Sequence, residues 1–419
     1  MKKKVSFYTY GCKLNQYETQ GMADQLKEDF DITFNCEEAD FFIFNSCTVT
    51  SEAERKLRQH FRSLKKKNTN ALFIATGCYA KLDRQQFESL GFDLVLGIEE
   101  KTNIKKYIEN SSPCDKESKF FTISEYQNDH TRAFIGIQDG CLNTCAYCRI
   151  RLARGNKIKS KPVKIVKKEV EALVKRGYKE VVLTGINILY YGTDSDKNLL
   201  YLLQEIVKIE GDFRVRLSSL DPKLIDYGMI DFILSEKKLV NHFHLSLQSG
   251  SDEILKKMNR NYNTNDYFDI VSYCRNGDRR FSFTTDIIVG FPGESEKNFM
   301  ETLLFIQKII FLKIHVFRFS SRAGTPAYFF KDKIIPKIKK ERAKLLNEKA
   351  EETKKIYLDE NINSTSRVLI EVNENNYSRG YDQYYIYHYL SGKYKPNSFV
   401  QVKINKVYKN GVISNEKLL

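Results

Sequence analysis

The sequence predicts an α/β protein built from three successive units, and three observations support this. Short apolar segments alternate with amphipathic ones over roughly the first 110 residues, as in a doubly wound, mostly parallel sheet. A longer α/β alternation with six strand candidates follows, which favours a partial parallel (β/α)6 barrel. The last segment has short alternating stretches punctuated by glycines, which indicates a small five-stranded β-barrel.

The first unit, residues 1–110, is expected to place cysteines at one edge of its sheet. Cys12, Cys47 and Cys78 each follow a different strand candidate by one or two residues. Ligands gather at the carboxyl ends of parallel strands, so we expect these cysteines to converge on one point. The strand candidates are Val5–Tyr10, Ile32–Phe34, Phe41–Asn45, Leu72–Thr76 and Leu94–Leu96, and the helix candidates are Tyr17–Glu28, Glu52–Lys66 and Glu100–Ile108.

A polar linker, 111–129, precedes the second unit, 130–361. Active sites of parallel barrels lie at the carboxyl ends of the strands. Helical apolar spacing is seen at Val163–Arg176 and Asn198–Ile209, and a charged connecting helix is expected within Lys331–Asn361. The strand candidates are Ala133–Gln138, Glu180–Ile186, Phe213–Ser218, His242–Gln248, Phe281–Val289 and Ile314–Phe319.

Three further cysteines, Cys141, Cys145 and Cys148, have the spacing C-x-x-x-C-x-x-C in the loop after the first barrel strand. Three thiolates can hold three irons of a cubane cluster and leave the fourth iron free to bind a small molecule. The alternatives are a structural zinc site that lacks its fourth ligand, or a coincidence of spacing. Tyr147 adds an aromatic ring directly before the last cysteine.

Charge points to a polyanionic partner. Lys and Arg outnumber Asp and Glu by 68 to 53, a formal net charge of +15. Between Arg149 and Lys179 there are twelve basic residues against two acidic ones, which predicts a positive rim beside the cysteine motif for a phosphate backbone. A Lys-rich solvated surface is the alternative.

Nine cysteines without an apolar leader suggest reduced thiols in the cytoplasm and metal binding in place of disulfides. No apolar run is long enough to span a membrane, and a monomer is the default expectation. Cys36, Cys114 and Cys274 match no motif and are interpreted as ordinary thiols.

The third unit, 362–419, combines aromatic and basic residues in a way that suits RNA. Its strand candidates include Val368–Val372, Tyr384–Tyr389 and Phe399–Ile404. Stacking surfaces and cations together favour RNA contact, with barrel core as the alternative for half of the tyrosines. The residues concerned are Tyr377, Tyr381, Tyr384, Tyr385, Tyr387, Tyr389, Arg379, Lys393 and Lys395.

The motifs together resemble the radical S-adenosylmethionine (radical SAM) methylthiotransferases over essentially the whole chain. The segments Tyr-Gly-Cys12-Lys-Leu-Asn, Phe-Asn-Ser-Cys47-Thr and Thr-Gly-Cys78-Tyr resemble the N-terminal domain of that family. The run from Cys141 to Cys148, followed by Leu-Ala-Arg154-Gly, resembles its radical SAM domain, and the tail resembles its RNA-binding TRAM domain.

The resemblance implies two [4Fe–4S] clusters and S-adenosylmethionine. The cluster on Cys141, Cys145 and Cys148 would cleave this cofactor to a radical that removes hydrogen from carbon 2 of an adenine. The cluster on the other three cysteines would deliver a methylated sulfur. It further implies tRNA as substrate, a reductant such as flavodoxin or ferredoxin, and an unspecified sulfur donor. Residues near strand ends that could bind the cofactor or substrate, with a structural role as the alternative, are Tyr147, Gly185, Asn187, Ser219, Gln248 and Asp286.

The segment Gly-Cys12-Lys-Leu-Asn-Gln-Tyr-Glu resembles the branch that acts on N6-threonylcarbamoyladenosine next to the anticodon. The alternatives are the branches that act on N6-isopentenyladenosine or on an aspartate of a ribosomal protein. Two segments depart from the family pattern: Cys148-Arg-Ile-Arg-Leu-Ala-Arg lacks the usual proline, and His315-Val-Phe-Arg-Phe lacks Pro-Tyr-Ser-Pro. Two rivals remain, a radical SAM enzyme whose second cluster only transfers electrons and a non-catalytic RNA-binding zinc protein.

Overall fold

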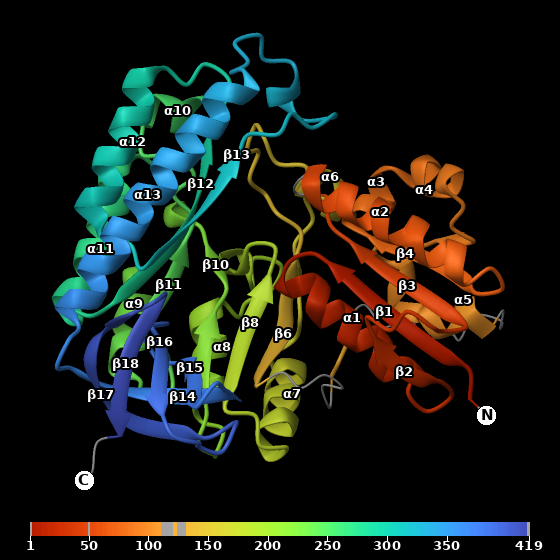
Figure 1. Ribbon diagram of the computed structural model, residues 1–419, viewed down its shortest axis with the longest axis horizontal. Helices are drawn as coiled ribbons and strands as arrows, with labels where there is room; N and C mark the ends of the chain where they lie inside the picture. The colour runs from red at the N-terminus through yellow and green to blue at the C-terminus, as the bar shows by residue number, and fades with distance from the viewer. Residues whose placement is uncertain (1, 49–50, 110–119, 124–130, 417–419) are drawn as a thin grey trace.

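The structure is a computed structural model that describes residues 2–48, 51–109, 120–123 and 131–416 (Figure 1). An N-terminal α/β unit, an open barrel of parallel strands and a small closed β-barrel follow one another along the chain, as the sequence predicts. The expected linker lies outside the described residues except for 120–123, where Phe121 and Ile123 are buried. None of the described helices is long and apolar enough to cross a lipid bilayer.

The N-terminal unit contains β1 (Lys4–Tyr10), α1 (Lys13–Leu26), β2 (Asp31–Phe34), β3 (Phe41–Ser46), α2 (Ser51–Lys67), β4 (Leu72–Gly77), α3 (Cys78–Leu82), α4 (Arg84–Leu90), β5 (Leu94–Val95) and α5 (Ile104–Glu109). Its strands form a parallel sheet in the order β2-β1-β3-β4-β5. Helices α1 and α5 cover one face and α2 and α4 the other, so the sheet is doubly wound. The core under α1 is continuous with that of the barrel, which joins the two units.

Local differences from the prediction have local causes. Helix α1 begins at Lys13, one turn before the expected start at Tyr17, because Leu14 is buried against the barrel while polar residues around it hide the apolar periodicity. The short helices α3 and α4 were not expected, since five and seven residues are too few to show a period of 3.6.

The central unit contains β6 (Arg132–Asp139), α6 (Ile150–Arg154), β7 (Lys159–Ser160), α7 (Val163–Lys175), β8 (Glu180–Gly185), α8 (Leu199–Val207), β9 (Arg214–Leu217), β10 (Ser219–Leu220), α9 (Tyr227–Ser235), β11 (His242–Leu245), α10 (Asp252–Lys257), α11 (Thr264–Gly277), β12 (Ser282–Val289), α12 (Glu296–Ile309), β13 (Lys313–Arg318) and α13 (Pro336–Glu360). Parallel pairing joins β6, β8 and β9 in one sheet and β10 to β13 in the next. Since β10 continues β9 after Ser218, the two sheets form one curved wall, which is the predicted partial barrel (Figure 1).

The tail closes into the predicted five-stranded barrel, in the order β14-β15-β16-β18-β17. Its strands are β14 (Thr365–Glu374), β15 (Tyr377–Tyr381), β16 (Tyr387–Ser391), β17 (Phe399–Tyr408) and β18 (Gly411–Glu416). The strand expected at Tyr384–Tyr389 begins only at Tyr387, because Tyr385 has a left-handed backbone (φ 66°) that ends any extended run.

The tail barrel docks on the amino ends of the central strands, opposite to the end where the cysteine motif lies. Arg214 donates hydrogen bonds to the carbonyl oxygens of Arg367 (3.1 Å) and Tyr381 (2.9 Å). The ring of Tyr385 stacks on His242 with 4.8 Å between centroids. Part of the tyrosine cluster expected to bind RNA therefore serves this internal contact instead.

Candidate active site

The triple-cysteine motif lies in the loop between β6 and α6, at the carboxyl end of the first barrel strand. The loop turns at Gly140 (φ +82°), where a Cβ would come within 2.1 Å of the carbonyl oxygen of Lys157, so only glycine fits. Cys141, Cys145 and Cys148 line a cavity of about 270 Å³ at the mouth of the barrel.

The three N-terminal cysteines line the same cavity. They follow β1, β3 and β4, which are neighbours in the sheet, so the expected convergence of Cys12, Cys47 and Cys78 is found. Cys12 precedes the first residue of α1 and Cys78 is the first residue of α3. Gly77 allows the chain to turn from β4 into α3 at Cys78: its φ is +96°, and a Cβ would lie 2.4 Å from the Ser46 carbonyl oxygen.

Two buried asparagines fix the cysteine-bearing loops to one another. Asn15 donates to Asn45 Oδ1 (3.0 Å) and to the Ser46 carbonyl (3.2 Å), and Asn45 donates back to the Asn15 carbonyl (2.9 Å). The thiol of Cys12 donates to Asn15 Oδ1 over 3.2 Å. The sequence could have indicated a role for these asparagines beside the cysteines, because they stand three residues after Cys12 and two before Cys47.

The spacing of the sulfur atoms disfavours a single shared metal ion. A tetrahedral zinc bound by thiolates at about 2.3 Å holds its sulfurs about 3.8 Å apart. Among the described residues, the group whose ligand atoms all lie within 4.8 Å of one another is His244, Asp286 and His315, and neither cysteine triad meets that condition. A cluster in which each thiolate binds its own iron does not require the three sulfurs to lie that close together.

Burial raises the pKa of two cysteine thiols of the motif, that of Cys141 and that of Cys148, the latter to about 11. A thiol must lose its proton to bind iron, so loading a metal at these two residues would release protons.

A polar wall that the sequence analysis missed borders the motif. Arg260 donates to Cys145 Sγ (3.0 Å) and to Asp221 Oδ2 (3.2 Å). Asn143 donates to Asp221 and accepts from the hydroxyl of Tyr190 (2.6 Å). Asn143 lies within the motif and could have been noticed, whereas Arg260 is 115 residues from Cys145 and carries no local signal.

Arg154 joins the two units at the cavity. Its guanidinium is fully buried and donates to Glu18 (2.6 and 3.0 Å), to Asp139 (3.1 Å) and to Cys78 Sγ (3.3 Å). Burial would raise the pKa of Glu18, but the charges of Arg154 and Lys101 outweigh it and lower this pKa from 4.5 to about 2. The ionised pair therefore stabilises the fold above about pH 4.5, and this contribution is lost as the pH falls toward 2.

Two more arginines of the central unit reach across the same junction. Arg149 donates to Thr48 Oγ1 (3.0 Å) and to Asp83 (2.9 Å). Arg322 donates to the Thr48 carbonyl (2.8 Å) and to Glu54 (3.1 Å). Both contacts hold the chain just beyond Cys47. Arg149 and Arg322 therefore stabilise the junction between the two units. Arg149 and Arg154 were expected in the positive rim that faces phosphates, but both form internal ion pairs instead.

Five of the six predicted cofactor-binding residues line the cavity: Tyr147, Gly185, Asn187, Ser219 and Gln248. Asn187 Oδ1 is buried without a hydrogen-bond partner in the described part of the chain, which leaves it free for a polar ligand. Asp286 differs, because it sits in the middle of β12, away from the cavity lining, with its carboxylate 3.4 Å from His244 Nε2. The strand ends at Val289, as predicted, three residues beyond Asp286, and a cofactor- or substrate-binding role for Asp286 stays a prediction.

The remaining cysteines lie elsewhere. Cys36 is half-buried and Cys274 is buried in α11, and neither forms a disulfide. Cys114 falls outside the described residues. The interpretation of these residues as ordinary thiols stays a prediction.

Comparison with known proteins identifies the family. Residues 135–306 match the Radical SAM superfamily and residues 4–97 match the family described as "Uncharacterized protein family UPF0004". The threonylcarbamoyladenosine tRNA methylthiotransferase MtaB of Thermotoga maritima is 40% identical over 98% of this chain and 96% of its own length. The MtaB of Bacillus subtilis is 36% identical over 84% of this chain and 81% of its own.

Two further proteins are less similar to this chain in sequence. The tRNA-2-methylthio-N(6)-dimethylallyladenosine synthase of Clostridium tetani is 33% identical over 96% of this chain and 94% of its own. The radical SAM methyltransferase TsrM of Kitasatospora setae, solved with cobalamin and a [4Fe–4S] cluster, shares the fold over 78% of this chain and 77% of its own (TM-score 0.58, 14% identity). The chain therefore belongs to the radical SAM methylthiotransferases, close to the enzymes named MtaB.

Proposed function

We propose that this protein is a cytoplasmic tRNA methylthiotransferase that adds a methylthio group to carbon 2 of N6-threonylcarbamoyladenosine next to the anticodon. The relatives named for that substrate are 36–40% identical, against 33% for the dimethylallyladenosine synthase of similar coverage. The observation that carries the proposal is the single cavity lined by both cysteine triads, since abstraction of hydrogen and insertion of sulfur must occur at one carbon atom.

We assign one iron–sulfur cluster to each triad. Cys141, Cys145 and Cys148 would hold the cluster that, when bound, would supply the radical chemistry needed to remove an aromatic hydrogen, which no side-chain base can do near neutral pH. The protein's part is placement. Asn187 Oδ1 would accept a hydrogen bond from the cofactor, Gly185 lines the cavity with Gln138 packed where its Cβ would lie, and Arg260 sets a positive charge beside Cys145. A small electron carrier such as flavodoxin or ferredoxin is the expected reductant.

Mass spectrometry of tRNA nucleosides tests the reaction and the substrate together. Deleting the gene is expected to remove the methylthio form of threonylcarbamoyladenosine and to leave its precursor. Loss of the methylthio-isopentenyl nucleoside instead would assign the chain to the other branch. Up to eight irons per chain are expected after anaerobic purification, whereas two zincs and no iron would contradict the assignment.

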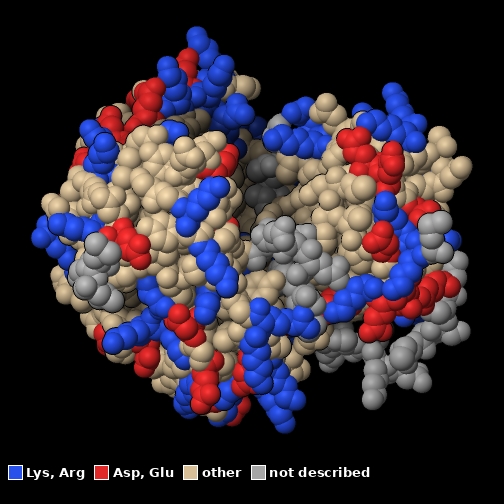
Figure 2. All heavy atoms as spheres, turned by 60° about the horizontal axis from the view of Figure 1, so that its bottom comes forward, with Lys and Arg blue, Asp and Glu red and all other residues tan. Residues whose placement is uncertain are grey.

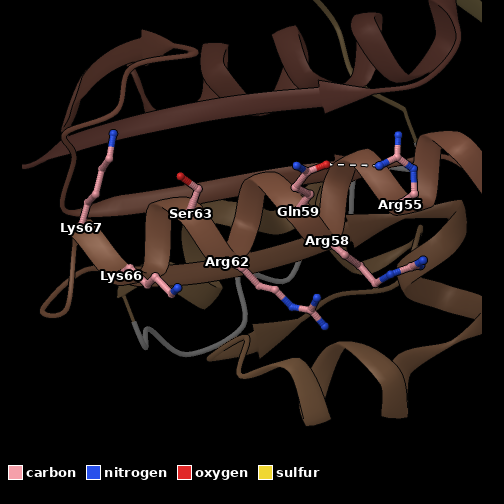
Figure 3. Close-up of a pocket in the computed structure, with 7 residues that line it drawn as sticks. All are labelled: Arg55, Arg58, Gln59, Arg62, Ser63, Lys66 and Lys67. Atoms are coloured by element: carbon pink, nitrogen blue, oxygen red, sulfur yellow. Dashed lines mark hydrogen bonds between the residues drawn. The ribbon is translucent and has the colours of Figure 1, made fainter.

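We further propose that the exposed face of α2 holds tRNA phosphates. Figure 2 shows Lys and Arg scattered over one face of the molecule with Asp and Glu among them, so charges of both signs are interspersed on that face. Helix α2 is different: Figure 3 shows side chains from its successive turns that carry cations and amide or hydroxyl groups and no carboxylate. An open pocket along this face of α2 is lined by Arg55, Arg58, Gln59, Arg62, Ser63, Lys66 and Lys67. Arg62 and Lys66 are exposed and form no hydrogen bond or ion pair within the described residues.

Replacing Arg62 and Lys66 together by glutamine is expected to weaken binding of the anticodon arm and to lower its salt dependence. Each phosphate contact contributes about 0.7–0.9 to the slope of log K against log salt, so the slope should fall by about 1.5. Titration of fluorescent RNA at several salt concentrations measures it. The matched control is Lys340→Gln with Lys344→Gln on α13, and an equal fall in that control would mean that only net charge matters.

A further inference from the structure

Inside the barrel, three neighbouring strands bring polar side chains together at a place that the cysteine cavity does not include. His244 on β11, Asp286 on β12 and His315 on β13 have ligand atoms within 4.8 Å of one another. His244 Nε2 lies 3.4 Å from Asp286 Oδ2, its Nδ1 lies 3.0 Å from Thr284 Oγ1, and the two imidazole centroids are 5.9 Å apart. All three residues are half-buried, and Figure 1 shows their strands side by side.

Lys13 adds a positive charge to this group. It is the first residue of α1 and directly follows Cys12, which lines the cysteine cavity. Its ammonium is close enough to Asp286 and to His315 to interact with both electrostatically. The side chain is half-buried and forms no hydrogen bond or ion pair within the described part of the chain.

The charges around Lys13 leave one cation in excess. Lys13 interacts electrostatically with Glu180 and Asp286, but forms no ion pair with either in the described part of the chain. Glu180 is shared by Arg214 and Arg216, and Arg132 pairs with Glu371 at 2.9 Å. Four cations (Lys13, Arg132, Arg214 and Arg216) thus face three carboxylates (Glu180, Glu371 and Asp286), and this excess positive charge favours an incoming anion.

A divalent metal is the rival occupant, because two imidazoles and one carboxylate are common metal ligands. The ammonium of Lys13 opposes it, since a second cation close to Asp286 would be repelled. The geometry favours a ligand with a negative group for Lys13 and a hydroxyl or amide for the histidines and Asp286.

The proposed substrate has these groups. In adenine, carbon 2 and the N6 nitrogen lie on the same edge of the ring, on either side of N1. A base that presents carbon 2 to the cysteine cavity therefore projects its N6 arm beside the reacting atom, where Lys13 follows Cys12. A threonylcarbamoyl arm ends in a carboxylate and a hydroxyl, whereas a dimethylallyl arm has neither.

We propose that Lys13 binds the carboxylate of the threonylcarbamoyl arm and that His244, Asp286 and His315 bind its hydroxyl and amide groups. The inference rests on the proposed function and names the residues that select its substrate. Lys13 thus determines specificity, because a site built around a charged partner rejects an analogue that lacks the charge. Asp286, expected to bind the cofactor or the substrate, is assigned to the substrate arm.

The test compares the cluster-loaded wild type with Lys13→Met and Lys13→Arg on anticodon-arm RNAs. The RNAs carry threonylcarbamoyladenosine, its carboxamide analogue in which the carboxylate is an amide, or isopentenyladenosine. Lys13→Met is expected to lower kcat/KM for the first RNA by about 30- to 100-fold, mainly through KM, since a charge-assisted hydrogen bond is lost. The wild type should discriminate against the carboxamide by a similar factor, and Lys13→Met should not discriminate. Lys13→Arg should recover part of the loss.

Several outcomes would overturn the inference. Equal losses of Lys13→Met on the charged and carboxamide RNAs would show that Lys13 does not read the carboxylate. If each chain bound one divalent metal other than iron and His315→Ala removed it, the group formed by His244, Asp286 and His315 would be a metal site instead. Iron content and RNA dissociation constants, measured in every variant, separate substrate recognition from damage to the neighbouring cluster. If the wild type acted only on the isopentenyladenosine RNA, the proposed function itself would be refuted. If the wild type acted on the threonylcarbamoyladenosine RNA and Lys13→Met were equally active on it, only this inference would be refuted.

Discussion

Cys145→Ala abolishes reductive cleavage of S-adenosylmethionine, whereas Cys47→Ala retains cleavage and abolishes methylthio transfer: this is the largest effect that we expect from single substitutions. Cys145 belongs to the triad at the carboxyl end of β6, and Cys47 to the triad at the sheet edge. Loss of a partner that only orients a metal ligand costs 10- to 100-fold in metal affinity or activity, so loss of the ligand itself should exceed about 100-fold. Chromatography of 5′-deoxyadenosine and mass spectrometry of the RNA report the two steps separately.

The matched control is Cys274→Ala, which removes a buried thiol of α11 far from both triads in the fold. It is expected to leave cleavage, transfer and iron content at wild-type levels once folding is verified. Separate roles for the two triads would be refuted if Cys47→Ala lost cleavage as completely as Cys145→Ala while retaining half of its iron. The same iron measurement shows whether each triad binds a cluster on its own.

The convergence of six cysteines was predictable because it follows from local pattern and one rule of topology. Each N-terminal cysteine stands just after a short apolar run, and parallel strands present their carboxyl ends at one edge. The junction that unites the two triads was not predictable in this way. Arg154 meets Glu18 across 136 residues and Arg322 meets Glu54 across 268, and no periodicity relates side chains so far apart.

The tail shows a second limit of prediction from sequence. Its tyrosines and cations have a composition typical of RNA-binding surfaces, but composition does not tell which side of a barrel faces the next domain. Tyr384 is buried with its ring under Arg280 (4.1 Å), and Tyr385 stacks on His242. Deleting the tail would therefore uncover charges that are now satisfied, such as Arg214 and Arg216. Point substitutions on exposed faces are the cleaner test of RNA contact.

Arg154→Leu is expected to destabilise the junction by about 3–5 kcal/mol, the cost of removing one partner from a buried ion pair. Glu18 would keep Lys101, but Asp139 and Cys78 would each lose a donor beside the N-terminal triad. The midpoint of urea unfolding measures the change. Lys105→Leu is the control: its pair with Asp29 is exposed (43% and 41%), and such pairs contribute about 0–1 kcal/mol. An unchanged midpoint for Arg154→Leu would mean that the junction is held by its apolar contacts. Retention of only half the iron by a folded variant would show that this arginine keeps the N-terminal cysteines at the barrel mouth, where the shared chemistry requires them.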